Sequence, residues 1–280
     1  MKCVEKAYAK VNLTLAVGEK RPDGYHEVVS VMQRVSLHDT LTAERTASGI
    51  SLTCSDPALP AGEENLAHRA AALFFRETGI TGGVALALEK SIPSQAGLGG
   101  GSSDAASVLL ALRRLYAPAL SDTALEAMAA ALGSDVPFFI RGGTALATGR
   151  GERLAPLPRL REGWFVIVKP PEGFSTPAMY RRLDELPPEP PRPDGMPAAL
   201  ETGDVRAVAA MLCNSFERAV PPDSAVRDIE DALRAHGALA ALLSGSGSAV
   251  FGLFDREDAA RAAAEVLRAR WPLTFAAQPV

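Results

Sequence analysis

Hydrophobic and polar residues alternate near the start of the chain. From 4 to 17 the apolar positions include Val11, Leu13, Leu15 and Val17. A period of two is typical of a half-buried strand, and it places Lys10 within that strand. The turn signal at 21–24 (Arg-Pro-Asp-Gly) and the β-rich composition of 28–37 then predict that the chain opens as strand, turn, strand.

A helical pattern follows. Residues 65–77 place several apolar side chains on one side, glycines end the helix, and 84–88 predicts a strand. The glycine-rich stretch 93–104 then opens an Ala/Leu-rich helix that runs to about Tyr116. A further helix is expected over about 121–132.

Beyond Gly133, residues 137–147 predict a strand broken by two glycines, so Asp135 is expected between the end of a helix and an apolar strand.

Proline and a fresh apolar strand mark the second half of the chain. Prolines at 156 and 158 precede the strand predicted over 164–168, which places a domain boundary near residue 155. Six prolines between 187 and 197 predict a surface loop. Residues 244–248 (Ser-Gly-Ser-Gly-Ser) separate two predicted strands, 238–243 and 249–254.

Composition narrows the class of protein. The chain has 280 residues, 47% hydrophobic and 22% charged, which is the balance of a globular protein. A net charge of -4 without a basic run argues against nucleic-acid binding. Three distant cysteines fit neither a disulfide framework nor a zinc site. The charged N-terminal segment and the lack of a long apolar stretch predict a cytoplasmic location with no membrane partner.

The glycine-rich stretch predicts a phosphate site. It lies between a predicted strand and a predicted helix, where glycines admit a close ligand and unpaired N–H groups attract an anion. It is not a Walker loop, because no lysine follows Gly101, and it is not a Rossmann loop, because Ser102 stands at the third glycine position. The alternative is a flexible linker, which the strand-to-helix position disfavours.

Lys10 and Asp135 are candidates for chemistry. Phosphoryl transfer to an alcohol needs a group to accept the hydroxyl proton and a cation near the moving charge. A solvated turn aspartate and a strand-edge lysine are the alternatives. For residues 244–248 the choice lies between a flexible turn and a second wall of backbone against the substrate.

Three segments together resemble one superfamily, the galactokinase, homoserine kinase, mevalonate kinase and phosphomevalonate kinase (GHMP) superfamily. They are 10–13 (Lys-Val-Asn-Leu), 93–103 and 244–247. Within it, 21–27 (Arg-Pro-Asp-Gly-Tyr-His-Glu) and 133–137 (Gly-Ser-Asp-Val-Pro) are similar to the diphosphocytidyl-methylerythritol kinases. That resemblance implies phosphorylation of the 2-hydroxyl of a cytidine-diphosphate-linked methylerythritol by ATP, in the non-mevalonate route to isoprenoid precursors.

The resemblance also implies a two-domain α+β fold with the active site in the interdomain cleft. An ATP-binding domain similar to ribosomal protein S5 would span 1–155, and a ferredoxin-like domain 156–280.

The resemblance assigns roles to single residues. Asp135 would be the base and Lys10 its cationic neighbour. The ATP site would comprise Pro93, Ser94, Gln95, Ala96, Gly97, Leu98, Gly99, Gly100, Gly101, Ser102, Ser103 and Asn65. The acceptor site would comprise Asn12, Tyr25, His26, Thr176, Tyr180, Gly245, Ser246 and Gly247, with aromatic faces for the cytosine.

One departure from the family concerns the ATP loop. The family has more glycine before the leucine, where this chain has Ser94-Gln95-Ala96. No dedicated magnesium carboxylate stands out, so Mg²⁺ is expected to arrive with ATP and to meet a hydroxyl such as that of Ser103.

Three rival interpretations stay open. A sister kinase would act on mevalonate, homoserine or galactose, although the Tyr25-His26 pair argues for an acceptor with a base. A relative without turnover would bind nucleotide or sugar as a sensor. A dinucleotide-dependent oxidoreductase is disfavoured by the missing third glycine. The oligomeric state, monomer or homodimer, is open.

Overall fold

The computed structural model describes residues 1–187 and 195–280. The described chain forms two compact units made of interleaved segments. Unit 1 comprises Met1–Ala9, His38–Ile92 and Gly99–Gly142, and unit 2 comprises Lys10–Leu37, Pro93–Leu98 and Gly143–Val280. The predicted division near residue 155 stays a prediction.

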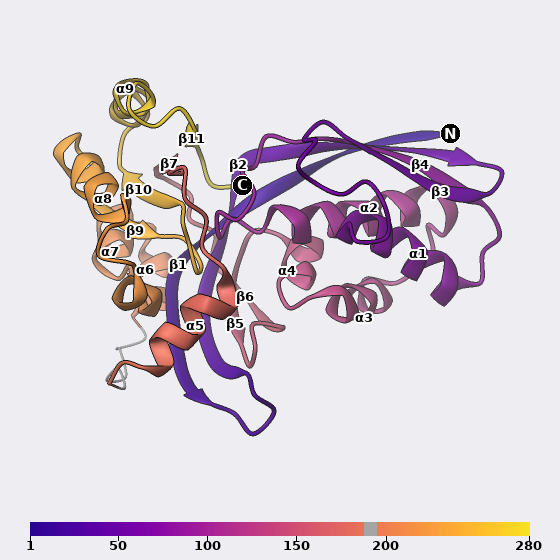
Figure 1. Cartoon of the computed structure of the whole chain (residues 1–280), viewed down its shortest axis with the longest axis horizontal. Helices are drawn as coiled ribbons and strands as arrows, with labels where there is room; N and C mark the ends of the chain where they lie inside the picture. Colours follow the sequence, from indigo (N-terminus) through magenta and orange to yellow (C-terminus); the bar gives the residue numbers. More distant parts are fainter. Residues whose placement is uncertain (188–194) are drawn as a thin grey trace. The chain divides into compact units, whose positions relative to one another are not determined.

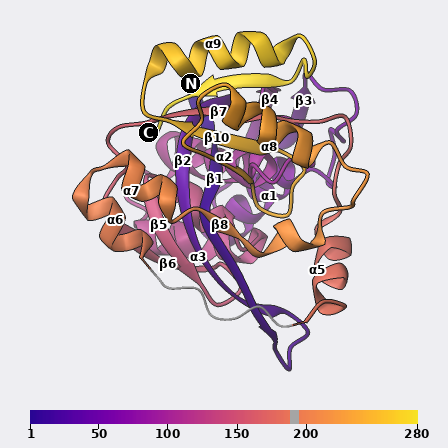
Figure 2. The ribbon, with the colours of Figure 1, turned by 90° about the vertical axis from the view of Figure 1, so that its left-hand side faces the viewer.

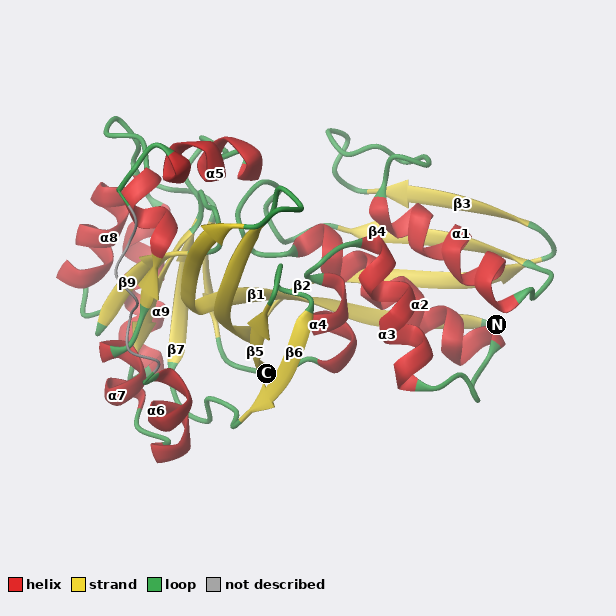
Figure 3. Cartoon of the chain, turned by 90° about the horizontal axis from the view of Figure 1, so that it is seen from below, coloured by secondary structure: helices red, strands yellow, loops and turns green. Residues whose placement is uncertain are grey.

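Unit 1 combines strands with a layer of helices on one face (Figures 1 and 3). Its elements are parts of β1 (Lys2–Lys20) and β2 (His26–Thr46), then β3 (Gly49–Cys54), α1 (Leu66–Thr78), β4 (Gly83–Glu89), α2 (Gly100–Tyr116), α3 (Asp122–Leu132) and α4 (Val136–Arg141). Strand β4 pairs antiparallel with β2, from Thr40↔Glu89 to Thr46↔Gly83, and parallel with β3. Helix α1 therefore connects two parallel neighbours, as a parallel pair requires.

The local sequence explains the helices of unit 1. The Asn65 side chain caps α1 by accepting from the Ala67 N–H at 2.9 Å, and left-handed Gly79 ends the helix. Ser121 caps α3 in the same way. The first half of helix α2 is largely buried, and the buried side chains include polar as well as apolar ones: Ser103, Asp104, Ala105, Ala106, Ser107, Val108 and Leu109.

The strand predicted over 137–147 is wrong in its first half and confirmed in its second. Residues 137–141 belong to α4, and the strand β5 (Thr144–Thr148) begins only after the two glycines. Pro137 lies in the first turn of α4, where its missing N–H is not needed, and it therefore favours a helix start. Phe138 and Phe139 are buried in unit 1, so the apolar run reflects burial and not a strand.

Unit 2 contains a four-stranded antiparallel sheet in the order β11-β7-β10-β9. Its further elements are β5, β6 (Arg153–Leu157), β7 (Trp164–Val168), α5 (Thr176–Asp184), α6 (Met196–Thr202), α7 (Val205–Ala210), β8 (Cys213–Asn214), η1 (Ser215–Ala219), α8 (Val226–Ala235), β9 (Ala240–Leu243), β10 (Val250–Phe254), α9 (Glu257–Arg268) and β11 (Thr274–Ala277). Helices α8 and α9 pack on this sheet (Figure 2), and their apolar faces share its core. Within the same unit β1 pairs with β8 and β2 with β5.

The predicted strands on either side of residues 244–248 are confirmed as β9 and β10, and the predicted strand at 164–168 is β7. The proline-rich loop prediction is only partly testable, since 188–194 lie outside the described residues. At its end the prediction is wrong, because Pro197 lies in the first turn of α6, a position that tolerates proline. No helix in the described part of the chain is long and apolar enough to cross a membrane.

Candidate active site

Two glycine-containing loops of unit 2 contact each other. The Ser244 hydroxyl donates to the Gly97 carbonyl at 3.1 Å, and the Ala249 N–H donates to the Ala96 carbonyl at 3.2 Å. Gly97 has φ +72, and a Cβ there would run into the Ser244 carbonyl. Glycine is therefore required at 97 both by the left-handed backbone and by the close approach of the second loop. The first half of the predicted ATP loop is thus tied to the predicted third motif.

Lys10 lies beside this junction and is buried, with 4% of its surface exposed. Its backbone N–H donates to the Leu98 carbonyl at 3.0 Å, and its Nζ donates to Asn12 Oδ1 at 2.6 Å. Asn12 in turn donates to Ser30 Oγ at 2.7 Å. A Cβ on Gly245 would lie 3.3 Å from Lys10 Nζ, so the second loop passes close to the amine. The strand-edge alternative for Lys10 is thereby excluded.

The predicted cytosine residues gather at the start of β2 and along α5. His26 is buried, and its Nε2 lies 2.7 Å from Asp184 Oδ1. Its ring stacks on Tyr180 with centroids 4.8 Å apart and an interplanar angle of 18°. One face of Tyr180 is therefore covered by His26. Tyr25 is 55% exposed, and the Arg150 guanidinium lies over its ring at 4.8 Å.

Asp184 is a partner of the predicted site residue His26 that the sequence did not reveal. It stands 158 positions from His26, and nothing in its local sequence marks it. The hydrogen bond to His26 lowers the pKa of the Asp184 carboxyl, with a further contribution from Lys20 at 3.3 Å. A carboxylate there holds the imidazole in one orientation. The first residue of α5, Thr176, bonds Ser246 through the two hydroxyls at 2.8 Å and so links this cluster to the glycine loop.

The second half of the predicted ATP loop forms the start of α2 in unit 1. The Ser103 N–H donates to the Gly99 carbonyl at 2.9 Å and makes the first bond of this 17-residue helix. Gly99 has no side chain that could cap the helix, so within the described chain no side-chain capping bond satisfies the N–H groups of 100–102. A Cβ on Gly101 would meet nothing within 4 Å. Such a helix start is suited to binding an anion.

Asp135 also belongs to unit 1. The structure corrects its expected setting, because it lies at the start of α4 and not before a strand, and its side chain makes no capping bond there. A carboxylate at a helix N-terminus is compatible with the helix dipole. Asn65 serves as the α1 cap and donates to the Pro60 carbonyl at 2.7 Å. Asp135, Asn65 and 99–103 thus lie in one unit and the other predicted site residues in unit 2, and the predicted pairing of Lys10 with Asp135 stays a prediction.

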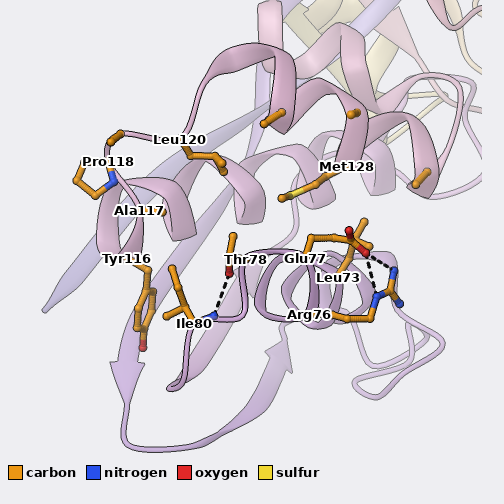
Figure 4. Close-up of a pocket in the computed structure, with 14 residues that line it drawn as sticks. Leu73, Arg76, Glu77, Thr78, Ile80, Tyr116, Ala117, Pro118, Leu120 and Met128 are labelled. Carbon is orange, nitrogen blue, oxygen red and sulfur yellow. Dashed lines mark hydrogen bonds and ion pairs between the residues drawn. The ribbon is translucent and has the colours of Figure 1, made fainter.

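A pocket of about 900 Å³ lies elsewhere in unit 1, between α1, α3 and the end of α2 (Figure 4). Leu73, Ile80, Tyr116, Leu120 and Met128 are among its lining side chains, and Arg76 and Glu77 form an ion pair beside it. None of the predicted site residues is among the described residues that line it. Among the described residues there is also no group of three or more His, Cys, Asp or Glu that could hold a metal ion.

Comparison with known proteins identifies relatives along the whole chain. The family model of the GHMP kinases N terminal domain matches residues 65–143, and that of the GHMP kinases C terminal matches residues 196–273. A 4-diphosphocytidyl-2-C-methyl-D-erythritol kinase of Symbiobacterium thermophilum is 48% identical over 260 residues, covering 91% of this chain and 92% of the relative. One of Pelotomaculum thermopropionicum is 47% identical, covering 94% and 93%.

Solved structures agree with these relatives. A crystal structure of 4-(cytidine 5'-diphospho)-2C-methyl-D-erythritol kinase matches with a TM-score of 0.85 and 42% identity, covering 99% of each chain. A homoserine kinase from Cytophaga hutchinsonii matches with a TM-score of 0.76, 17% identity and coverage of 99% and 95%. The second likeness concerns the fold alone.

Proposed function

Because the chain belongs to the family of 4-diphosphocytidyl-2-C-methyl-D-erythritol kinases among the GHMP kinases, we propose that it phosphorylates the 2-hydroxyl of 4-diphosphocytidyl-2-C-methyl-D-erythritol. ATP is the phosphoryl donor, and the product enters the non-mevalonate route to isoprenoid precursors. A cytoplasmic location belongs to this proposal, since ATP is supplied there.

The observation that supports ATP as the phosphoryl donor is the start of α2, which has no side-chain cap. The N–H groups of residues 100–102 point out of a long helix with no side-chain cap, and Gly101 leaves the space beside them open. Polyphosphate oxygens are the natural acceptors for such groups. The sequence in front of them, 93–98, is held by the bonds to the 244–249 segment described above. The protein's own hydrogen bonds therefore hold this part of the loop.

For the chemical step we assign the base to Asp135 and the cation to Lys10. The acceptor oxygen forms a bond to the γ-phosphorus while the bond to the β,γ-bridging oxygen breaks, and ADP leaves. The hydroxyl proton passes to the Asp135 carboxylate. The Lys10 ammonium, which is buried and oriented by Asn12, stabilises the negative charge that develops on the transferred group.

For the acceptor we assign the cytidylyl end to Tyr25, His26 and their neighbours. Tyr25 is more than half exposed and, beside the Arg150 guanidinium that lies over its ring, can offer an aromatic face to a pyrimidine, whereas Tyr180 uses one face to support His26. Asp184 fixes the imidazole that presents hydrogen-bonding groups to the base. Asn12, Thr176 and the 245–247 backbone would contact the remainder of the substrate.

Mg²⁺ enters this proposal with ATP. The protein itself offers the ion little: Ser103 carries a hydroxyl in the first turn of α2 but is buried, with 1% of its surface exposed, so phosphate oxygens and water would supply most of the ligands. The ion would neutralise phosphate charge.

The test is ADP release by the purified chain with Mg-ATP and one acceptor at a time. Release with the cytidylyl acceptor, and not with mevalonate, homoserine or galactose, is the expected result. Release with one of these three would assign a different acceptor to the same fold. Binding of ATP without turnover on any acceptor would favour a sensor and refute the kinase assignment.

A further inference from the structure

Three buried ionisable side chains of unit 1 meet beside the first turn of α2. They are Asp39 of β2, Lys90 just after β4, and Asp104 of α2, with 0%, 8% and 5% of their side-chain surfaces exposed. Lys90 Nζ donates to Asp104 Oδ2 at 2.5 Å and also to Asp39 Oδ2. Because the three stand 51 and 14 positions apart in sequence, no local motif reveals this cluster.

The cluster adjoins the backbone on both sides of the predicted ATP loop. Asp39 Oδ1 accepts the N–H groups of Ser91 and Ile92, at 2.6 and 2.8 Å, and these two residues directly precede the loop. Asp104 lies one turn into the helix whose N-terminus we assign to phosphate. A Cβ on Gly100 would lie 3.7 Å from Asp39 Oδ2 and 3.1 Å from the Ile92 side chain, so the cluster also adjoins the first residue of α2.

The composition of the cluster is poorly suited to stability alone. Two carboxylates share one ammonium, and Asp104 Oδ1 is buried without a hydrogen-bond partner in the described chain. Burying such charges costs free energy that an apolar cluster of the same size would avoid. Burial, followed by the charge of Asp39, raises the pKa of Asp104 to about 7 against the opposing effect of Lys90. What the ionic cluster offers in return is directed bonds to defined backbone atoms.

We propose that Asp39, Lys90 and Asp104 are positioning residues for the nucleotide: they hold residues 91–92 and the first turns of α2 in the geometry that binds polyphosphate. They act through the backbone and do not themselves contact ATP. The inference rests on the proposed function, because it takes residues 93–103 as the ATP site.

The test compares Lys90→Met and Asp104→Asn with a matched control, Glu230→Gln. Glu230 of α8 is also a buried carboxylate, 3% exposed, with an ion pair to Arg234 at 3.3 Å and an oxygen without a partner in the described chain. It belongs to unit 2, whereas the three cluster residues belong to unit 1. For each protein we would measure the dissociation constant of Mg-ATP by equilibrium titration, the Michaelis constants of both substrates, and the melting temperature.

Lys90→Met should raise the dissociation and Michaelis constants for ATP at least tenfold while changing that of the cytidylyl acceptor less than about twofold. Asp104→Asn, which keeps the side-chain volume, should raise the dissociation and Michaelis constants for ATP severalfold. Glu230→Gln should leave ATP binding unchanged. The proposal would be overturned if folded Lys90→Met had a lower melting temperature but wild-type ATP affinity. If Lys90→Met does not fold, the same result for Asp104→Asn would overturn it. Absence of ATP binding in the wild type would instead refute the proposed function.

Discussion

At the scale of single residues, Lys10 shows how a charge is kept in a buried place. Its amine donates to Asn12, whose amide donates to Ser30, and the Ser30 hydroxyl donates to the Thr14 carbonyl at 2.7 Å. Each polar group in this row has a partner, as buried polar groups need. The protein's own hydrogen bonds therefore give the side chain a defined direction, which is what electrostatic stabilisation of a transition state requires.

Asp135→Asn tests the proposed base. An amide cannot accept the hydroxyl proton, so kcat should fall by about 10²–10⁴-fold. The dissociation constant of ATP should stay within about twofold, because the variant keeps size and removes only the proton acceptor. Rapid-quench measurement of a single turnover would report the chemical step directly. Near-normal turnover would remove Asp135 from this role.

Tyr25→Ala tests the proposed stacking. The ring is more than half exposed, so its loss should change the melting temperature little. Loss of base–aromatic stacking, worth about 1–3 kcal/mol, should raise the Michaelis constant for the cytidylyl acceptor roughly 5- to 150-fold and leave that for ATP unchanged. Met211→Ala, at another exposed apolar side chain of unit 2, is the control and should change neither constant. A selective effect on ATP would mean that the two pockets are exchanged.

At the scale of elements, the two glycine-containing loops depend on each other. The backbone of 95–97 and that of 244–249 share hydrogen bonds and leave no room for a side chain at 97. The departure from the family at Ser94-Gln95-Ala96 falls here too, since Gln95 adopts φ +50, a left-handed conformation that glycine favours. Its carbonyl nevertheless accepts the Ser248 N–H at 3.3 Å, so the loop keeps its bonds with glutamine present.

Gly97→Ala and Gly101→Ala should have opposite effects on stability. At 97 the methyl group meets the Ser244 carbonyl in a left-handed backbone, which should lower the free energy of unfolding by about 1–3 kcal/mol. At 101 the methyl group extends from a helix into open space, and the substitution should raise the free energy of unfolding by about 0.5–1 kcal/mol. Urea denaturation measures both. Despite its added stability, Gly101→Ala should weaken ATP binding if phosphate occupies that space; unchanged affinity would contradict the assignment.

Sequence patterns predicted most elements of the fold but not every contact in the site. Alternation predicted the strand of Lys10, and glycine before an Ala/Leu-rich run predicted α2, because both signals are local. The run Pro137-Phe138-Phe139 was misread, since a short, wholly buried apolar segment has no periodicity that separates helix from strand. Lys90 and Asp184 were missed because their partners are distant in sequence.

At the scale of the whole molecule, two buried carboxyl groups make stability depend on pH. Burial is the main cause in both, raising the pKa of Asp104 to about 7 and, with the neighbouring Glu217, that of Glu230 to about 8. Their ordinary values are about 4. The folded protein therefore holds these protons more tightly than the unfolded chain. The stabilisation is fully present below about pH 4 and is lost as the pH rises through 7 and 8.

Asp104→Asn and Glu230→Gln should each flatten this dependence. Neither amide titrates, so the slope that its carboxyl contributes, at most about 1.4 kcal/mol per pH unit, disappears. The effect should be confined to about pH 4–7 for Asp104 and pH 4.5–8 for Glu230. Denaturation midpoints at constant ionic strength, taken as the difference between variant and wild type, give the measurement. Parallel profiles would show that the carboxyl does not titrate in that window.

The interleaving of the two units also constrains the order in which they can be completed during synthesis. All segments of unit 1 lie before residue 143, so the ribosome has made the whole of unit 1 when about half of the chain exists. Residues 10–37 and 93–98, by contrast, belong to a unit whose sheet comes from the last segments made. The nascent chain must therefore carry residues 95–97, the front of the proposed ATP loop, without their hydrogen-bond partners until residues 244–249 emerge. The proposed nucleotide site can become complete only late in translation.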